Sequence, residues 1–277
     1  MLPTSPSAAR GRRDRCPGVL RPWQADDGSL VRIRLIGGEV SAAALRGLAE
    51  IASTFGDGNL HLTSRANLQL RAVDHGEPFV RAVERLGLLP SRRHDRARNV
   101  LVSPLTGRLG GRLDARPLAA DLDRLIRADE RLADLPGRFL FTLDDGRGDL
   151  IRRPTDLGFM ALGPEMVQLR VGRSWGEVIE AGRAVPALGV LAHAFLDARG
   201  PGADAPWHVA ELLRPLTAPR RPDQRTHVEP EAHALGAALV RVPDAVLTPG
   251  LVADVTARGG ALVVTPWRSI VVTELLP

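Results

Sequence analysis

The chain of 277 residues contains one cysteine, Cys16, and neither lysine nor tyrosine. One cysteine excludes an internal disulfide, and one thiolate cannot by itself hold an iron–sulfur cluster that needs four cysteine ligands. Aromatic residues are only 4% of the chain, which leaves few platforms for stacking on bases. The basic residues are also scattered among 32 acidic ones, so nucleic-acid binding is not expected.

The chain also lacks long apolar runs. No stretch approaches the roughly 20 apolar residues that cross a bilayer. The basic segment from Met1 to Arg15 is not followed by the apolar stretch of a signal peptide. We therefore expect a soluble, cytoplasmic protein without a membrane partner.

Every cationic side chain other than histidine is an arginine, and the formal net charge is +5. A genome biased toward GC-rich codons explains the loss of lysine and tyrosine, but the physical consequence holds regardless. A guanidinium stays protonated and presents a planar fork of donors that suits carboxylates. A groove lined by these arginines would suit a polyanionic substrate.

Composition and hydrophobic periodicity predict a mixed α and β chain with internal segments. The predicted segments are a disordered lead-in (1–18), a first β-α-β half-domain (19–89), a mixed α/β region (90–199), a proline-rich linker (200–230) and a second β-α-β half-domain (231–277). In the first half-domain, the alternation of Leu30–Leu35 predicts a strand, and Ser41 is a suitable N-cap for a helix from Ala42 to about Phe55. Two extended pieces, 60–63 and 68–71, and a helix over 78–86 follow.

The middle region is predicted to begin as a loop over 90–112, interrupted by the apolar stretch 100–102. A helix follows from Arg116, then strands near 139–143, 157–161 and 167–171. Two further helices, over 177–184 and 187–198, are predicted to be separated by Pro186.

The opening pattern returns near the end of the chain. Residues 238–242, 249–257 and 262–265 repeat the order of strand, helix and strand, and Thr265 corresponds to Thr63. In this alignment Trp267 takes the position of Arg65. We interpret this as an internal duplication, although chance similarity between two β-α-β units is the alternative, because the unit is common.

Three short motifs carry arginines in this order. The first is 62–69, which contains Arg65, and the second is 98–104, which begins with Arg98 and Asn99. The third is 135–140, in which Arg138 precedes Phe139. These motifs and the duplicated layout resemble the nitrite and sulfite reductases, although Leu140 departs from the basic residue that is frequent at its position.

Within that superfamily, the chain is most similar to the precorrin-3B synthases of aerobic cobalamin synthesis. The segments that carry this likeness are 16–18, 99–105, 116–118, 139–145 and 265–268. The resemblance implies an α+β fold in which two ferredoxin-like β-α-β half-domains flank a mixed α/β core half-domain. It also implies a [4Fe–4S] cluster held by four cysteines in a further core half, which these residues do not include, so the cluster is expected to be absent from this chain.

The resemblance assigns candidate residues for binding the carboxylates of a siroheme-like or precorrin tetrapyrrole, or a bound anion. The main candidates are Arg65, Asn67, Arg98, Asn99 and Arg138, and the second rank is Thr63, Trp267, Arg268 and Cys16. Ordinary surface arginine, an inert cysteine and a core tryptophan are the alternative interpretations. The histidines show no metal-site spacing and no nucleophile–base pair stands out, so neither a metal site nor a catalytic residue is predicted.

The predicted function is a short precorrin-3B-synthase-like oxidoreductase that binds a tetrapyrrole and depends on an iron–sulfur-bearing partner chain. The alternatives are a non-catalytic tetrapyrrole carrier, a subunit of a sulfite or nitrite reductase, and a truncated product without a stable fold. Half of a pseudo-symmetric core would expose apolar surface, which a homodimer would cover.

Overall fold

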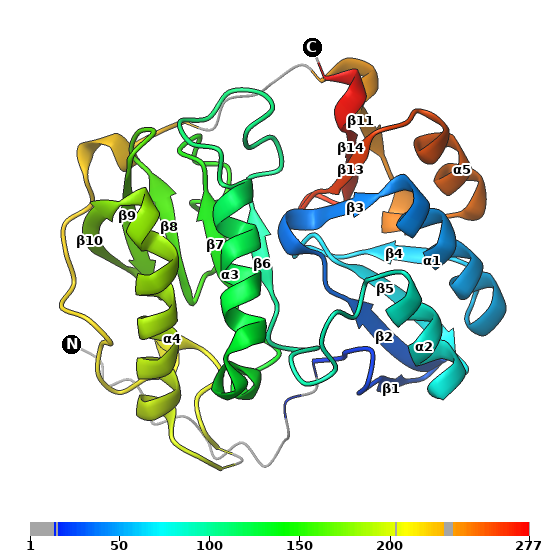
Figure 1. The fold of residues 1–277 in the computed structure, drawn as a ribbon, viewed down its shortest axis with the longest axis horizontal. Coiled ribbons are helices and arrows are strands. Elements are labelled where there is room, and N and C mark those ends of the chain that lie inside the picture. The colour runs from blue at the N-terminus through cyan, green and yellow to red at the C-terminus, as the bar shows by residue number, and fades with distance from the viewer. Residues whose placement is uncertain (1–13, 15, 203, 230–234, 277) are drawn as a thin grey trace.

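The computed structural model describes all residues except 1–13, 15, 203, 230–234 and 277. They form an α+β protein with two lobes (Figure 1). The middle lobe has one mixed sheet with α3 (Arg116–Ala128) and α4 (Ala184–Arg199) packed on it. The repeat lobe has two antiparallel sheets with α1 (Ala42–Phe55), α2 (Glu77–Arg85) and α5 (Pro249–Ala257). No helix in the described ranges is long and apolar enough to span a membrane.

The first sheet of the repeat lobe has the order β1-β2-β5-β4-β12. Its strands are β1 (Trp23–Ala25), β2 (Gly28–Ile33), β4 (Leu60–Leu62), β5 (Leu68–Val73) and β12 (Val246–Leu247). The alternation predicted for the first strand is confirmed, because Val31 and Ile33 are fully buried while Arg32 is half-buried on the other face. The two predicted helices are also confirmed, and the Ser41 hydroxyl caps α1 by accepting from the backbone N–H of Ala44 at 3.1 Å.

The second sheet of the repeat lobe has the order β11-β14-β13-β3. Its strands are β3 (Glu39–Ser41), β11 (Leu239–Arg241), β13 (Ala261–Val264) and β14 (Ser269–Val272). Each repeat contributes a strand to the other's sheet, because β3 pairs with β13 and β12 pairs with β4. One hydrophobic core runs through both repeats, from Val31 and Leu45 to Leu247 and Val264. This exchange covers sheet edges that would otherwise be open.

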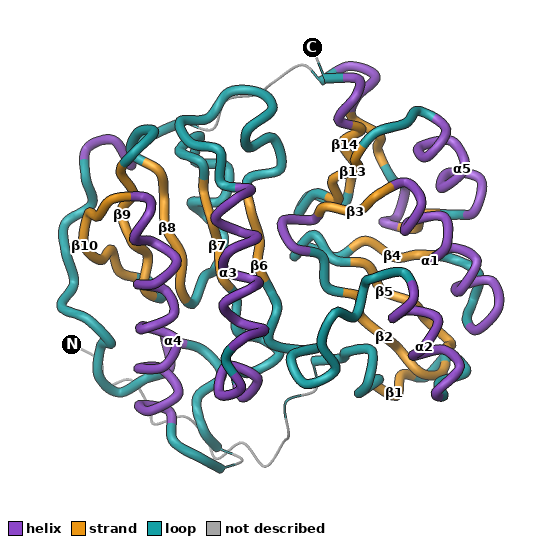
Figure 2. Tube along the Cα trace, in the orientation of Figure 1, coloured by secondary structure: helices purple, strands orange, loops and turns teal. Residues whose placement is uncertain are grey.

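The middle sheet has the order β10-β9-β8-β7-β6 and is parallel from β6 to β8 and antiparallel beyond. Its strands are β6 (Val100–Val102), β7 (Phe141–Asp144), β8 (Leu157–Ala161), β9 (Met166–Val171) and β10 (Ser174–Glu180). The short apolar stretch of the predicted loop is thus the edge strand β6. Figure 2 shows that the chain reaches β6 from α2 as loop.

Two predicted helices of the middle region are corrected by the structure. Residues 174–180 form strand β10, which pairs with β9, and not the start of a helix. The β-branched Val178 and Ile179 favour this extended form. Pro186 does not separate two helices but lies in the first turn of α4, where its missing N–H costs no hydrogen bond.

The segments before and after the middle lobe are attached to it. Most of the predicted lead-in lies outside the described residues, but disorder is wrong for Cys16–Gly18, which are buried. Asp14 fixes them by accepting from the backbone N–H of Gly137 at 2.6 Å. The proline-rich segment contacts the middle sheet, since Gln168 on β9 donates to the Arg221 carbonyl at 2.8 Å. Short 3-10 turns connect the elements at Ile36–Gly38, Glu130–Asp134, Ala181–Arg183, Val209–Glu211, Gln224–Thr226, Gly236–Ala238, Pro243–Ala245 and Thr273–Leu275.

Candidate anion-binding site

Two of the predicted arginines, Arg65 and Arg138, line one pocket with a volume of 440 Å³, which we call the arginine pocket. Arg32 and Cys16 line it as well, and Pro17, Trp23, Leu30 and Gln69 complete it. Arg65 and Arg138 are 73 positions apart in the sequence, yet the Arg65 guanidinium donates from Nη1 to the Arg138 carbonyl at 2.9 Å. The fold therefore gathers three guanidinium groups around one concavity.

Arg65 projects from the corner between β4 and β5. The Thr63 hydroxyl holds this corner by accepting from the backbone N–H groups of Arg65 at 3.4 Å and Asn67 at 3.1 Å. Asn67 is buried, and its Oδ1 accepts from the backbone N–H of Leu35 at 2.9 Å. Thr63 and Asn67 thus shape the backbone that carries Arg65, and burial lowers the pKa of Arg65 from its usual range.

Arg32 reaches the same pocket from β2. Its guanidinium donates to the Cys16 sulfur at 3.4 Å and to the Gln69 side chain at 3.4 Å. Its Nε is buried and has no hydrogen-bond partner among the described residues. A buried donor left unpaired beside a pocket is a position where a ligand oxygen fits. The exposed Arg138 guanidinium lies 5.1 Å from the ring centre of Trp207.

A buried network behind the pocket contains Asn99 and Arg34. Arg34 is 3% exposed and donates from Nε to Asn99 Oδ1 at 2.9 Å and from Nη2 to the Cys16 sulfur at 3.3 Å. Asn99 in turn donates to the Gly137 carbonyl at 3.0 Å, next to Arg138. Burial lowers the pKa of Arg34 to about 10, so it remains charged at neutral pH. Asn99 and Arg34 position the pocket from behind without lining it.

Arg32 and Arg34 were not predicted as site residues. The information was present in the alternating run 30–35, which places both arginines on the face opposite the core residues. Two cations on one face of a strand need anionic or sulfur partners. The sequence offers no indication that the segment around Cys16 covers that face.

Arg98 lies in a different pocket. Its Nε donates to Asp123 on α3 at 2.5 Å, and Arg127 pairs with the other oxygen of the same carboxylate at 2.8 Å. This second pocket, which we call the α3 pocket, has a volume of 440 Å³. Arg98 and Arg34 both line it, whereas Arg65 and Arg138 do not.

Trp267 and Arg268 lie in the turn between β13 and β14. The Thr265 hydroxyl accepts there from the backbone N–H groups of Trp267 at 3.3 Å and Ser269 at 3.2 Å. These bonds repeat those of Thr63 at the same offsets, and the positive φ of Ala66 (55°) recurs at Arg268 (61°). The internal duplication is thus confirmed at the level of this corner, with Trp267 in the position of Arg65.

Trp267 lines a third pocket, with a volume of 790 Å³, which we call the Trp267 pocket. Its lining residues are Pro104, Leu105, Arg147, Gly148, Asp149, Arg152, Arg153, Pro154, Glu229, Leu235, Leu239, Thr265, Trp267, Ser269 and Val271. None of them belongs to the arginine pocket. The structure therefore separates Trp267 from Arg65 and Arg138.

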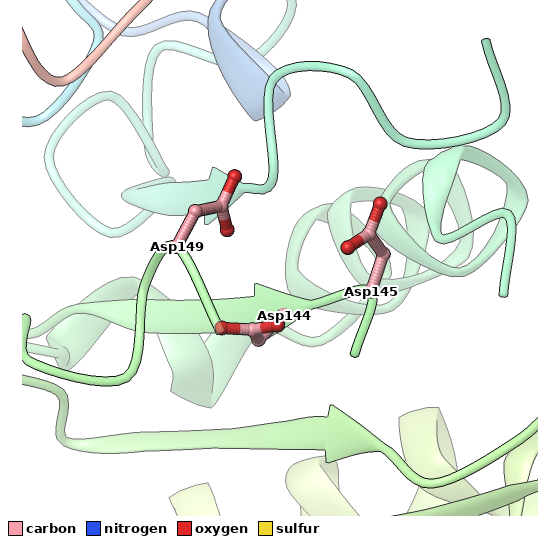
Figure 3. Close-up of side chains that lie close together, drawn as sticks. All are labelled: Asp144, Asp145 and Asp149. Carbon is pink, nitrogen blue, oxygen red and sulfur yellow. The ribbon is translucent and has the colours of Figure 1, made fainter. Parts of the chain in front are cut away.

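Three carboxylates lie close together where β7 ends: Asp144 is its last residue, and Asp145 and Asp149 follow it (Figure 3). Of the three, Asp149 lines the Trp267 pocket. Oxygen atoms of Asp144, Asp145 and Asp149 lie within 4.8 Å of one another, the spacing of metal ligands. Asp144 accepts from the backbone N–H groups of Gly146, Gly148 and Leu150, and the Arg147 guanidinium pairs with Asp145 at 2.8 Å. The carboxylates of Asp144 and Asp145 thus already have hydrogen-bond and ion-pair partners within the loop over 144–150, and they fix its conformation.

Burial shapes the acid–base properties of this cluster. It raises the pKa of Asp149 to about 7 and also raises the pKa of Asp144, and neighbouring carboxylates add to both effects. The Ser103 hydroxyl donates to Asp149 at 2.7 Å and opposes part of the rise. Asp149 can therefore gain or lose a proton near neutral pH.

Comparison with known proteins identifies relatives for parts of the chain. Residues 24–77 match the model of the nitrite/sulfite reductase ferredoxin-like half domain. A precorrin-3B synthase of Sinorhizobium sp is 39% identical over 67 residues, which are 24% of this chain and 15% of that protein. A sulfite reductase [ferredoxin] 2 of Mycolicibacterium paratuberculosis is 30% identical over 137 residues, which are 48% of this chain and 24% of that protein.

A structural neighbour covers more of the chain. The NirA protein of Mycobacterium tuberculosis superposes on 94% of this chain with a TM-score of 0.64 and 21% sequence identity. The match covers 57% of the NirA chain. The chain thus spans little more than half of this neighbour, and the aligned segments are a quarter or less of each of the two sequence relatives.

Proposed function

Since the chain belongs to the nitrite/sulfite reductase superfamily, we propose that its arginine pocket binds the carboxylates of a tetrapyrrole, either a siroheme-like cofactor or a precorrin substrate. The observation that carries the proposal is the hydrogen bond from Arg65 to the Arg138 carbonyl, which brings two separate motifs to one pocket. Fixed, permanently charged guanidinium groups on a strand and two loops suit a ligand that carries several carboxylates.

The residues of the pocket fit this ligand. The buried Arg32 Nε lacks a partner, and Arg65 and Arg138 offer further donors. The volume of 440 Å³ accommodates the carboxylate-bearing edge of a large ring. Within the proposal, Arg32, Arg65 and Arg138 hold the carboxylates, and Arg34 and Asn99 keep Cys16 and the Gly137 carbonyl in place behind them.

The associated reaction is proposed to be an oxidoreduction of the precorrin-3B synthase type, in cobalamin biosynthesis. The chain does not fit a [4Fe–4S] cluster, because its one thiol cannot replace four. We therefore propose that a partner chain with the missing cysteines supplies that centre, or that the chain serves as a carrier that binds the ring without converting it. Turnover of a precorrin by the chain with such a partner would separate these two roles.

Titration of the purified chain with sirohydrochlorin, the metal-free ring of siroheme, tests the binding proposal by absorbance. The variant in which Arg65→Gln and Arg138→Gln are combined is expected to weaken binding by at least tenfold, since a hydrogen bond to a charged group contributes about 1.5–3 kcal/mol. Arg241→Gln is the matched control, because Arg241 is exposed on β11 outside the pocket. Equal affinity of the double variant and this control would contradict the proposal.

A further inference from the structure

The two corners of the duplication have the same backbone and different side chains. Thr63 and Thr265 make equivalent hydrogen bonds, but the residue two positions later is a cation in the first repeat and an indole in the second. Each of these side chains lines its own pocket. From this we infer that the Trp267 pocket is a second ligand site, which takes a planar aromatic ring bearing a carboxylate.

The aromatic wall of the pocket is available for stacking. Trp267 is 53% exposed, which is unusual for so large an apolar side chain. The Arg153 guanidinium lies 5.9 Å from the centre of the indole ring and donates to the Pro266 carbonyl at 3.1 Å, so the ring is held in place. Leu105, Leu239 and Val271 add apolar surface.

The charges of the pocket favour an anion. Arg152 has no hydrogen-bond or ion-pair partner within the described ranges, and Arg153 bonds to a carbonyl and not to a carboxylate. Arg147 is paired with Asp145, but its buried Nη1 has no hydrogen-bond partner in the described part of the chain. Asp149 and Glu229 are the acidic groups of the lining. The lining thus offers two guanidinium groups, of Arg152 and Arg153, that carry no carboxylate partner among the described residues.

A volume of 790 Å³ suits a ligand of several fused rings. An apolar molecule without charge would leave Arg152 and Arg153 without counter-ions, and a small inorganic anion would leave the indole uncovered. The combination of ring stacking and a carboxylate satisfies both features. This site shares no residue with the arginine pocket, so it does not depend on the function proposed above.

Binding of pyrene-1-carboxylate, followed by quenching of tryptophan fluorescence, tests the inference. Trp267→Ala is expected to weaken binding of this probe by about tenfold, because it removes the stacking surface. Trp175→Ala serves as the control, since Trp175 lies on β10 outside the pocket. For all variants, anisotropy of the pyrene itself gives a readout that does not rely on the altered tryptophan.

A second pair of variants tests the charge requirement and does not disturb the packing of Trp267. Arg152→Gln combined with Arg153→Gln is expected to weaken pyrene-1-carboxylate by about tenfold and to leave the uncharged 1-pyrenemethanol unchanged. Arg173→Gln, at an exposed position outside the pocket, is expected to leave both probes unchanged. The inference is overturned if the double variant binds the carboxylate as the parent does. It is also overturned if only the Arg65→Gln and Arg138→Gln variant loses the probe, because the probe would then occupy the arginine pocket.

Discussion

Asp149 gives the chain a titration near neutral pH. Its carboxyl is mostly buried, and its pKa is raised to about 7, whereas an unfolded aspartate ionises near 3.8. Between these two values the folded state binds more protons than the unfolded state, so the free energy of unfolding falls as the pH rises from about 4 to 7. Above pH 7 the buried carboxylate is ionised, and the folded state carries the full free-energy cost of that charge.

Asp149→Asn removes this titration and keeps an oxygen that accepts from Ser103. Relative to the parent, the variant is expected to gain on the order of 2 kcal/mol of unfolding free energy between pH 5 and pH 8. Urea unfolding at both pH values measures this difference. Asp254→Asn, at an exposed position on α5, is the control. An equal pH dependence in the parent and Asp149→Asn would refute the assignment.

Among the single residues of the site, the sequence predicted Arg65 and Arg138 as anion-binding residues, whereas Arg32 and Arg34 were not predicted. Motifs identify residues one at a time, whereas a pocket depends on which segments meet. Cys16 lies within 3.4 Å of both missed arginines, a contact across 16 and 18 positions that periodicity does not reveal. Arg98 was predicted for the same site but lies in the α3 pocket, paired with Asp123. The sequence does not reveal this pairing, because nothing distinguishes Asp123 from the other aspartates of its helix.

Among the elements, the helices and the longer strands of both repeats were predicted to within a few residues, because their alternation and caps are local properties. The short strand β1 was not predicted. The reciprocal exchange of β3 and β12 was not predicted. Both strands are short, two or three residues long, and their partners lie in the other repeat. The start of a helix was predicted where strand β10 lies, because the pairing of β10 with β9 is a tertiary contact that helical periodicity does not reveal.

The glycine before β3 is critical for this exchange. Gly38 has a φ of +77°, and a Cβ atom there would lie 2.1 Å from the Val264 carbonyl oxygen on β13. Gly58 has a similar φ of +82° but open space around it. Comparing alanine substitutions at the two glycines therefore separates the cost of backbone strain from the cost of steric overlap.

We expect Gly58→Ala to cost about 1 kcal/mol of unfolding free energy. Gly38→Ala should cost roughly 2 kcal/mol more, because the backbone of β13 must shift. Chemical denaturation of both variants measures the difference, and equal costs would show that the contact between the repeats is loose.

For the whole molecule, the shared core of the repeat lobe predicts cooperative unfolding of both repeats. Leu247 lies on β12, is fully buried and pairs across the sheet with Leu60, so a residue of the second repeat completes the sheet of the first. Leu247→Ala is expected to lower the unfolding free energy by about 2–4 kcal/mol.

Two tryptophans report on the two sheets of this lobe, Trp23 in the first and Trp267 beside the second. In variants that retain one of them, with the other tryptophans changed to phenylalanine, Leu247→Ala should shift both denaturation curves to lower urea by the same amount. Leu213→Ala, which removes the same atoms from an exposed side chain, should shift neither curve. If the Trp23 curve stayed in place while the Trp267 curve moved, the two repeats would be independent domains, and the exchanged strands would contribute little to their association.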